Sequence, residues 1–110
     1  MPSYLVQVAY TPAALAALTK KPQNRAEAVR KAIEKLGGTM GPFYLSFGDY
    51  DVLGIVEMPD NVSAAAFALA LGAGGACRSV KTTPLLGMEE GMEAMKKAGT
   101  SGYKAVTAGK

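Results

Sequence analysis

Alternating residues along the chain predict its strands. Within residues 4–10, every second residue is a tyrosine or a valine. This period of two is typical of a strand with one buried face. Similar patterns predict further strands over residues 39–47, 52–58 and 76–86. Only the short stretch Gly-Asp-Tyr-Asp separates the second strand from the third, and a turn of this length predicts an antiparallel hairpin.

Hydrophobic residues at intervals of three and four predict helices between these strands. The clearest helix is residues 22–36, whose apolar stripe is followed by a pair of glycines that would end it. A shorter helix is expected over residues 13–18, with Thr11 as its cap and Pro12 in its first turn. An amphipathic helix is expected over residues 88–97.

The helix predicted over residues 61–71 differs from the others because it is apolar almost all round. Asp60 or Asn61 would cap its start. A surface helix of a small monomer normally has a polar face toward water. We therefore expect either a neighbouring element or another subunit to cover the second face of this helix.

The order of elements is β-α-β-β-α-β with a C-terminal helix. Short connections and right-handed crossovers make this an α+β fold of the ferredoxin-like type. The helices would cover one face of the sheet, and an apolar second face is not left bare in water. We therefore expect two sheets to pair face to face in an oligomer. The folded domain is predicted over residues 1–97, followed by a mobile basic tail over 98–110.

Composition excludes several classes of site. The 110 residues fit one domain, and 49% hydrophobic with 19% charged residues indicates a globular chain. The sequence has no histidine and one cysteine, which excludes histidine-ligated metals, serine–histidine catalysis and an intrachain disulfide. We predict no metal and no cofactor. No signal peptide or membrane span is expected, so the predicted location is cytoplasmic.

The net charge of +3 raises the question of nucleic-acid binding. Residues 1–95 hold eight basic and nine acidic residues, whereas residues 96–110 hold four lysines and no acid. The basic excess therefore belongs to the tail and not to a face of the domain. A nucleic-acid surface needs clustered basic residues on one element. We predict no nucleic-acid partner.

Two aspartates in the predicted turn are candidates for chemistry. Asp49 and Asp51 flank Tyr50, and two close carboxylates would raise the pKa of one of them, as a general base requires. The same pair could bind a divalent cation with outside ligands. The alternative is structural, since aspartate side chains cap turns. Asp51 is the stronger catalytic candidate because it begins a strand.

Tyrosines and arginines are candidates for binding. Some of the tyrosines Tyr4, Tyr10, Tyr44 and Tyr50 could line a pocket between sheet and helices, where a phenol offers a flat wall with a hydroxyl. Packing across a dimer interface explains them equally well. Arg25, at the start of a helix, could bind a carboxylate, or form a salt bridge to Asp51 or Glu57. Arg78 offers the same two alternatives.

Sulfur-containing residues suggest packing. Cys77 precedes an arginine that could lower the pKa of its thiol, but no histidine is present as a base, so a buried structural thiol is expected. Met88, Met92 and Met95 recur at helical intervals, which predicts core or interface packing.

Several of these stretches resemble GYD-domain proteins. The signature is FYLSFGDYD over residues 43–51, which ends in the Gly-x-Tyr-Asp core. Supporting stretches lie at residues 25–28, 36–38, 57–60 and 68–72. The resemblance covers roughly residues 3–95 and implies a dimeric α/β barrel of ferredoxin-like architecture. Similar barrels include small monooxygenases, isomerases, dechlorinating enzymes and ligand-sensing domains, so the resemblance implies no single activity.

The sequence thus predicts an oligomeric module that binds a small organic ligand. The predicted ligand-binding residues are Tyr10, Arg25, Tyr44 and Tyr50, with a cleft near Tyr44, Tyr50 and Asp51. One alternative is a cofactor-independent oxygenase or isomerase acting on an aromatic or enol substrate, with Asp51 as the base. Another is a structural subunit whose surfaces serve assembly. The only macromolecular partner expected is a further copy of the chain.

Overall fold

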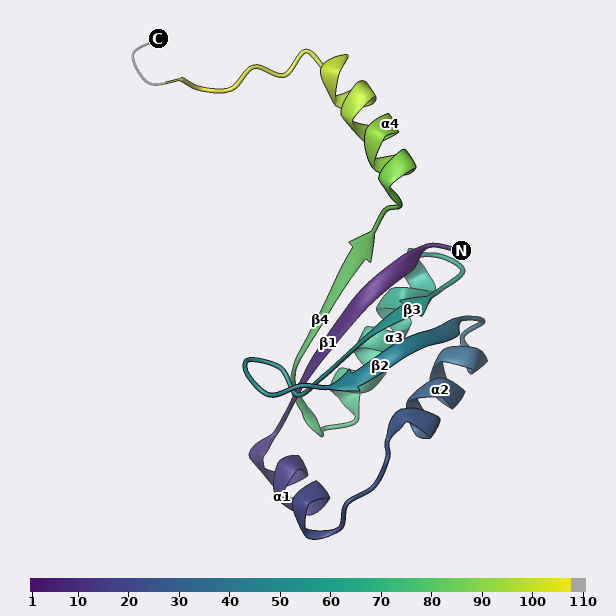
Figure 1. Ribbon diagram of the computed structural model, residues 1–110, viewed down its shortest axis with the longest axis vertical. Helices are drawn as coiled ribbons and strands as arrows, with labels where there is room; N and C mark the ends of the chain where they lie inside the picture. The colour runs from purple at the N-terminus through teal and green to yellow at the C-terminus, as the bar shows by residue number, and fades with distance from the viewer. Residues whose placement is uncertain (108–110) are drawn as a thin grey trace.

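Strands and helices alternate along the chain in the computed structural model, which describes residues 1–107 (Figure 1). The elements are β1 (Ser3–Tyr10), α1 (Pro12–Lys20), α2 (Ala26–Lys35), β2 (Thr39–Leu45), β3 (Val52–Glu57), α3 (Asn61–Ala73), β4 (Cys77–Leu85) and α4 (Met88–Gly99). The described residues thus form an α+β fold with four strands and four helices. Two helices lie between β1 and β2, so the element order is only broadly that of a ferredoxin-like domain.

The four strands form one antiparallel sheet in the order β2-β3-β1-β4. β1 is central and pairs with β3 on one side and β4 on the other. β2 pairs with β3, which confirms the predicted hairpin. The ladder between β2 and β3 shifts register between Met40 and Phe43, where Gly41 and Pro42 intervene. Such an irregularity is expected where a proline lies on an edge strand, and β2 is at the edge of the sheet.

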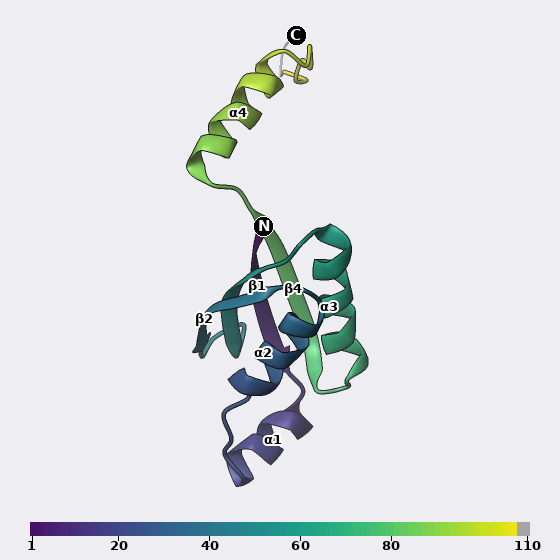
Figure 2. The same cartoon turned by 90° about the vertical axis from the view of Figure 1, so that its right-hand side faces the viewer.

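The core lies between the sheet and two helices. Figure 2 shows α2 and α3 on the same side of the sheet, while α1 and α4 lie beyond its opposite ends. Val6 of β1 and Val56 of β3 pack in one buried cluster with Ile33 of α2 and Phe67 of α3. Each of these four side chains is at most 2% exposed. The alternation in β1 therefore marks the helix-covered face, as predicted.

Glycine at position 54 permits one close contact in this core. Gly54 of β3 pairs directly with Phe43 of β2. A Cβ atom at Gly54 would collide with the ring of Phe43. The missing side chain therefore allows the Phe43 ring to lie over β3 on the helix-covered face.

Side-chain caps begin two of the helices where the sequence predicts. The Thr11 hydroxyl accepts a hydrogen bond from the Ala14 N–H at 3.1 Å. The Asp60 carboxylate accepts from the Ser63 N–H at 2.8 Å, and this bond lowers the pKa of Asp60. These bonds satisfy N–H groups that have no partner within the helix.

The start of α2 differs from the prediction. The helix begins at Ala26 and not at Pro22. The Asn24 carboxamide oxygen accepts a hydrogen bond from the Ala26 N–H at 2.9 Å. An asparagine side chain that bonds the backbone two residues ahead forms a turn that competes with helix. Residues 21–25 are therefore a loop that carries Arg25 outside the helix.

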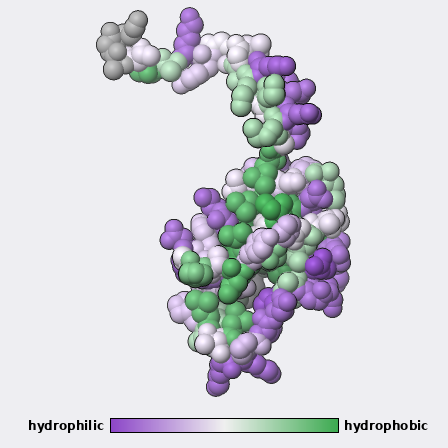
Figure 3. All heavy atoms as spheres, viewed as in Figure 1, coloured by the Kyte–Doolittle hydropathy of each residue, from purple (hydrophilic) through white to green (hydrophobic). Residues whose placement is uncertain are grey.

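The other face of the sheet has no helix on it within the described residues. Register places Leu5, Leu53 and Ile55 together at the centre of this open face. All three remain partly exposed. In Figure 3, hydrophobic residues form a stripe over the strands, with hydrophilic residues on either side.

α4 extends away from the rest of the molecule (Figure 1). None of its residues is buried. Met88 is 82% exposed, Met92 56% and Met95 68%, so the expected packing in this chain's own core is wrong. The radius of gyration is 17.8 Å, against roughly 13 Å expected for a domain of this length. The interface alternative for these methionines stays a prediction.

The predicted boundary between domain and tail falls inside α4, which continues to Gly99. Residues 102–107 have no regular secondary structure, and residues 108–110 of the predicted tail lie outside the described part of the chain. No helix among residues 1–107 is long and apolar enough to cross a membrane.

Candidate functional site

A cavity of about 550 Å³ lies beside the helix-covered face of the sheet. It is bounded by the C-terminal ends of β1 and β2, the start of β4, the last turns of α3 and the loop that leads into α2. Its walls are mostly apolar, with Val8, Val29, Phe43, Phe67 and Leu71 among them. The volume is in the range of small-molecule sites, and such sites are mostly apolar with a few polar groups.

The structure brings three of the predicted binding residues to this cavity. Tyr10 at the end of β1, Arg25 before α2 and Tyr44 on β2 all line it. Tyr44 is 63% exposed, and its register opposite Leu53 turns its side chain away from that of Phe43. Tyr44 therefore stands at the outer edge of the cavity, whereas Tyr10 and Arg25 supply its polar wall.

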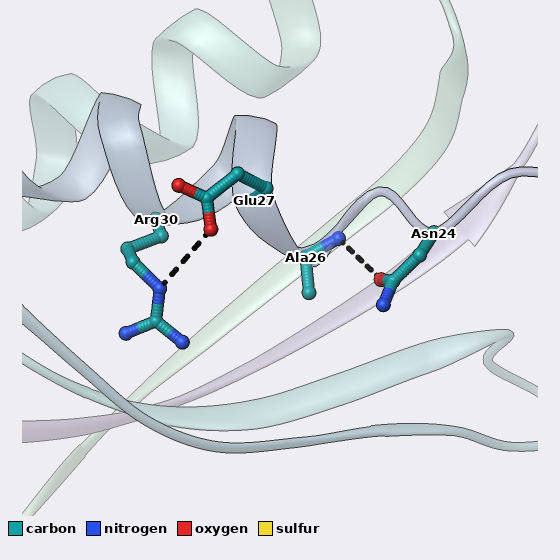
Figure 4. Close-up of polar contacts among 4 residues, drawn as sticks. All are labelled: Asn24, Ala26, Glu27 and Arg30. Atoms are coloured by element: carbon teal, nitrogen blue, oxygen red, sulfur yellow. Dashed lines mark hydrogen bonds and ion pairs between the residues drawn. The ribbon is translucent and has the colours of Figure 1, made fainter.

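Local hydrogen bonds hold the loop that carries Arg25. Figure 4 shows the Asn24 side chain bonded to the backbone of Ala26, which fixes the turn on both sides of Arg25. The Arg25 guanidinium donates to the Gln23 carboxamide oxygen at 3.2 Å. Gln23 and Asn24 also line the cavity. The loop thus gathers three polar side chains at one end of an apolar space.

Arg25 is the one formally charged residue among the described residues that line the cavity. The predicted salt bridge to Asp51 is absent, since Arg25 has no carboxylate within 4.0 Å in the described part of the chain. The neighbouring Arg30 differs, because its guanidinium lies 3.6 Å from the Glu27 carboxylate (Figure 4). Arg25 therefore retains donors that no side-chain acid of this chain uses.

Tyr10 and Cys77 lie side by side at the sheet end of the cavity. The two residues are partners in the β1–β4 ladder, next to a shift in its register. Burial raises the pKa of the Tyr10 phenol, as do the nearby Cys77 and Asp51, while the charge of Arg25 lowers it. Burial also raises the pKa of the Cys77 thiol. Both groups are therefore protonated at neutral pH and can donate hydrogen bonds.

Asp51 and Tyr50 lie outside the lining of the cavity. The Asp51 carboxylate accepts a hydrogen bond from the Tyr10 N–H at 2.8 Å, and its own N–H donates to the Val8 carbonyl at 2.8 Å. The Tyr50 carbonyl accepts from the Ser46 hydroxyl at 2.7 Å. These bonds tie the β2–β3 turn to the end of β1. The catalytic role of Asp51 and the binding role of Tyr50 stay predictions.

Other candidates also have definite places. Asp49 is exposed in the turn. Tyr4 is 2% exposed and lies in the core, where its hydroxyl donates to the Asn61 carboxamide oxygen at 2.6 Å. It does not line the cavity. Among residues 1–107, no three Cys, Asp or Glu side chains gather in a way that could hold a metal ion.

Sequence reasoning missed part of the site. Cys77, expected to be a buried structural thiol, is only partly buried and lines the cavity. Gln23 and Asn24 were not singled out, although asparagine two residues before an amphipathic stretch is a recognisable turn signal. Phe67 gave no signal of its own, because a phenylalanine in an apolar helix has the same pattern whether it faces a core or a cavity.

The comparison with known families decides the relationship. The GYD domain model matches residues 4–95, which include β1 except its first residue, the other three strands, the first three helices and most of α4. The chain belongs to the GYD domain family. The match includes the Gly-x-Tyr-Asp core, so the resemblance inferred from residues 43–51 is confirmed. No curated protein matches the chain. In this GYD domain, the signature residue Asp51 is bonded to the backbone of Tyr10, which lines the cavity, while the loop before α2 supplies the charge of the cavity wall.

Proposed function

We propose that this GYD domain is a small-molecule binding module that assembles with copies of itself. The observation that carries the binding function is the apolar cavity of about 550 Å³ with Tyr10 and Arg25 on its wall. A cavity of this kind can bury most of a small organic ligand and orient it through a few hydrogen bonds.

Asp51 is the reason to favour binding over catalysis. The enzyme alternative needs a base within hydrogen-bond reach of the substrate. The Asp51 carboxylate instead accepts the Tyr10 N–H at 2.8 Å and does not line the cavity. The groups that do line it, the Tyr10 phenol and the Cys77 thiol, both have raised pKa values and are weak bases or nucleophiles at neutral pH.

Two exposed apolar surfaces support assembly. The open face of the sheet presents Leu5, Leu53 and Ile55 with no helix over them in the described residues. On α3, Val62 is 79% exposed and Leu69 73% exposed. Contiguous exposed apolar patches of a soluble domain commonly mark interaction surfaces. We propose that the sheet face forms a dimer and that α3 adds contacts between dimers.

Native mass spectrometry of the untagged full chain tests both parts of this proposal. The expected spectrum contains a dimer or larger species that carries additional mass from a retained small molecule. Mild collisional activation should release that mass and leave the subunits intact. As a control, the chain with Phe67→Trp narrows the cavity without adding charge and should retain less of the small molecule.

Each outcome of this experiment tests a different part of the proposal, either ligand binding or assembly. An oligomer without additional mass, together with no binding in a screen of small organic compounds, would leave only the structural-subunit alternative. A monomer that retains a small molecule would refute assembly and keep binding. Turnover of a screened compound that is lost in Asp51→Asn would instead support the enzyme alternative.

A further inference from the structure

The charge of the cavity wall limits what the cavity can bind. Among the described lining residues, Arg25 carries the single formal charge, and no aspartate or glutamate faces it there. An uncharged ligand would cover part of the exposed Arg25 guanidinium without giving it a partner, which is unfavourable. A cationic ligand would be repelled. The complementary ligand therefore carries a negative charge at the end of the cavity near residues 23–25.

The donors at this end suit an oxyanion. A guanidinium has five N–H donors in a fork that matches a carboxylate, and one of those on Arg25 is used by Gln23. The Tyr10 hydroxyl, which is protonated at neutral pH, adds another donor on the same cavity wall. The Asn24 oxygen already accepts the Ala26 N–H and so does not present an unpaired acceptor to the anion.

The remainder of the wall suits an aromatic body. Phe43 and Phe67 line the cavity, and the Tyr10 ring contributes a third aromatic side chain. Aromatic pairs prefer offset or edge-to-face arrangements, which a flat ring system can form with such walls. Val8, Val29 and Leu71 complete an apolar surface with no further charge in the described lining.

We infer that the cavity binds an aromatic monocarboxylate, with its carboxylate at Arg25 and Tyr10 and its ring among Phe43, Phe67 and Cys77. This inference rests on the proposed binding function and specifies its ligand class. Arg25 is the residue that selects the anion, and the aromatic walls select the ring. No chemical change of the ligand is part of the inference.

Binding can be measured with defined probes on the full chain. The probes are 2-naphthoate, its neutral analogue 2-naphthamide and the aliphatic anion octanoate, each titrated by calorimetry. We expect 2-naphthoate to bind about tenfold more tightly than 2-naphthamide. This ratio is at the lower end of the range for a hydrogen bond to a charged group, because Arg25 is exposed and solvent screens its charge. Octanoate should bind more weakly than 2-naphthoate.

A variant of Arg25, just before α2, and a variant of Arg30, within α2, form a matched pair. Arg25→Gln should abolish the preference for 2-naphthoate over 2-naphthamide, because it weakens the binding of 2-naphthoate more than that of 2-naphthamide. Arg30→Gln should keep the preference, because Arg30 pairs with Glu27 and does not line the cavity. Circular dichroism and thermal denaturation of both variants establish that the fold is intact.

Cys77 reports where the probe binds. It is the single cysteine of the chain and lines the cavity, so its alkylation by N-ethylmaleimide adds one mass increment per chain. Bound 2-naphthoate should slow this alkylation several-fold in the wild-type chain. Binding without such protection would place the probe elsewhere and overturn the inference.

The remaining outcomes separate the ligand class from the binding function. Equal affinity for 2-naphthoate and 2-naphthamide, with Cys77 protected by both, would overturn the anion preference and keep the cavity as a binding site. Octanoate binding as tightly as 2-naphthoate would overturn the aromatic preference. Failure of all three probes would overturn the ligand class, while a small molecule retained in native mass spectrometry would preserve the proposed function.

Discussion

Asp51 shows how one side chain can join parts of the chain that are distant in sequence. Its carboxylate accepts the Tyr10 N–H at 2.8 Å, and its backbone N–H donates to Val8 at 2.8 Å. Its carbonyl accepts from the Ser46 N–H at 2.8 Å. The GYD core is therefore bound to the end of β1, directly behind the tyrosine that lines the cavity.

Replacement of Asp51 by alanine should lower the free energy of unfolding by about 1–3 kcal/mol, because the partly buried Tyr10 N–H loses its acceptor. Asp51→Asn keeps an oxygen acceptor without the charge, so its loss should be smaller. Urea denaturation followed by circular dichroism measures both values.

Asp49→Ala is the control, since Asp49 is an exposed residue of the same turn. Its unfolding free energy should change by no more than about 0.5 kcal/mol, as for most surface substitutions. Equal effects of Asp49→Ala and Asp51→Ala would contradict the role assigned to the Asp51 hydrogen bond.

Single residues of the site were predictable only where their chemistry is unusual for their surroundings. Tyr10 and Arg25 were found because a phenol in a strand and a guanidinium at a helix start stand out in the sequence. Cys77 was assigned to the core, since the sequence does not reveal the register that places it opposite Tyr10. Tyr50 was grouped with the other tyrosines as a phenol that could line a pocket; it does not line this cavity, and its binding role stays a prediction.

At the scale of elements, α3 is exceptional because it has no polar face. Its inward face buries Ala64 and Phe67, as expected for a helix over a sheet. Its outward face presents Val62 and Leu69 to solvent, and the helix carries no charged residue between Asn61 and Ala73. No neighbouring element of the described chain covers this face, and its coverage by another subunit stays a prediction.

Leu69→Glu should therefore weaken assembly through α3. A charge placed in an apolar interface must be desolvated without a partner, so species larger than the dimer should fall to dimers. Multi-angle light scattering after size exclusion measures the mass. Ala28→Glu is the control, because it adds the same charge to the exposed side of α2. An unchanged mass distribution in Leu69→Glu, with larger species still present, would rule out an α3 interface.

Elements were predictable where hydrophobic period and capping agree. All four strands appear within two residues of their predicted limits, and the caps Thr11 and Asp60 begin α1 and α3. The predicted start of α2 at Pro22 was wrong. Proline is a good first residue of a helix, but the Asn24 side chain forms a turn with the Ala26 N–H, and the helix begins only after that turn.

At the scale of the whole molecule, α2 and α3 cover one face of the sheet, no helix of residues 1–107 lies on the other face, and α4 extends away from the sheet (Figures 1 and 2). The sequence predicted an apolar second face that pairs with the sheet of another subunit. The register places Leu5, Leu53 and Ile55 together on that face, and the pairing stays a prediction. The direction of α4 was not predictable, because an amphipathic pattern shows that a helix has an apolar side but not what that side contacts. Because α4 follows β4 directly, its exposed methionines lie beyond the C-terminal end of that strand.

Ile55→Lys should convert the assembled protein to monomers. Ile55 pairs with Leu5 at the centre of the open face, so a lysine there would place a like charge from each subunit near the middle of a face-to-face dimer. The side chain remains free to reach water in the monomer, because Ile55 is only partly buried, and the fold should therefore persist. Light scattering gives the mass and circular dichroism the fold. Val62→Lys, an equivalent change on exposed α3, should leave the dimer intact. A folded Ile55→Lys variant that remains dimeric would mean that the subunits associate through another surface.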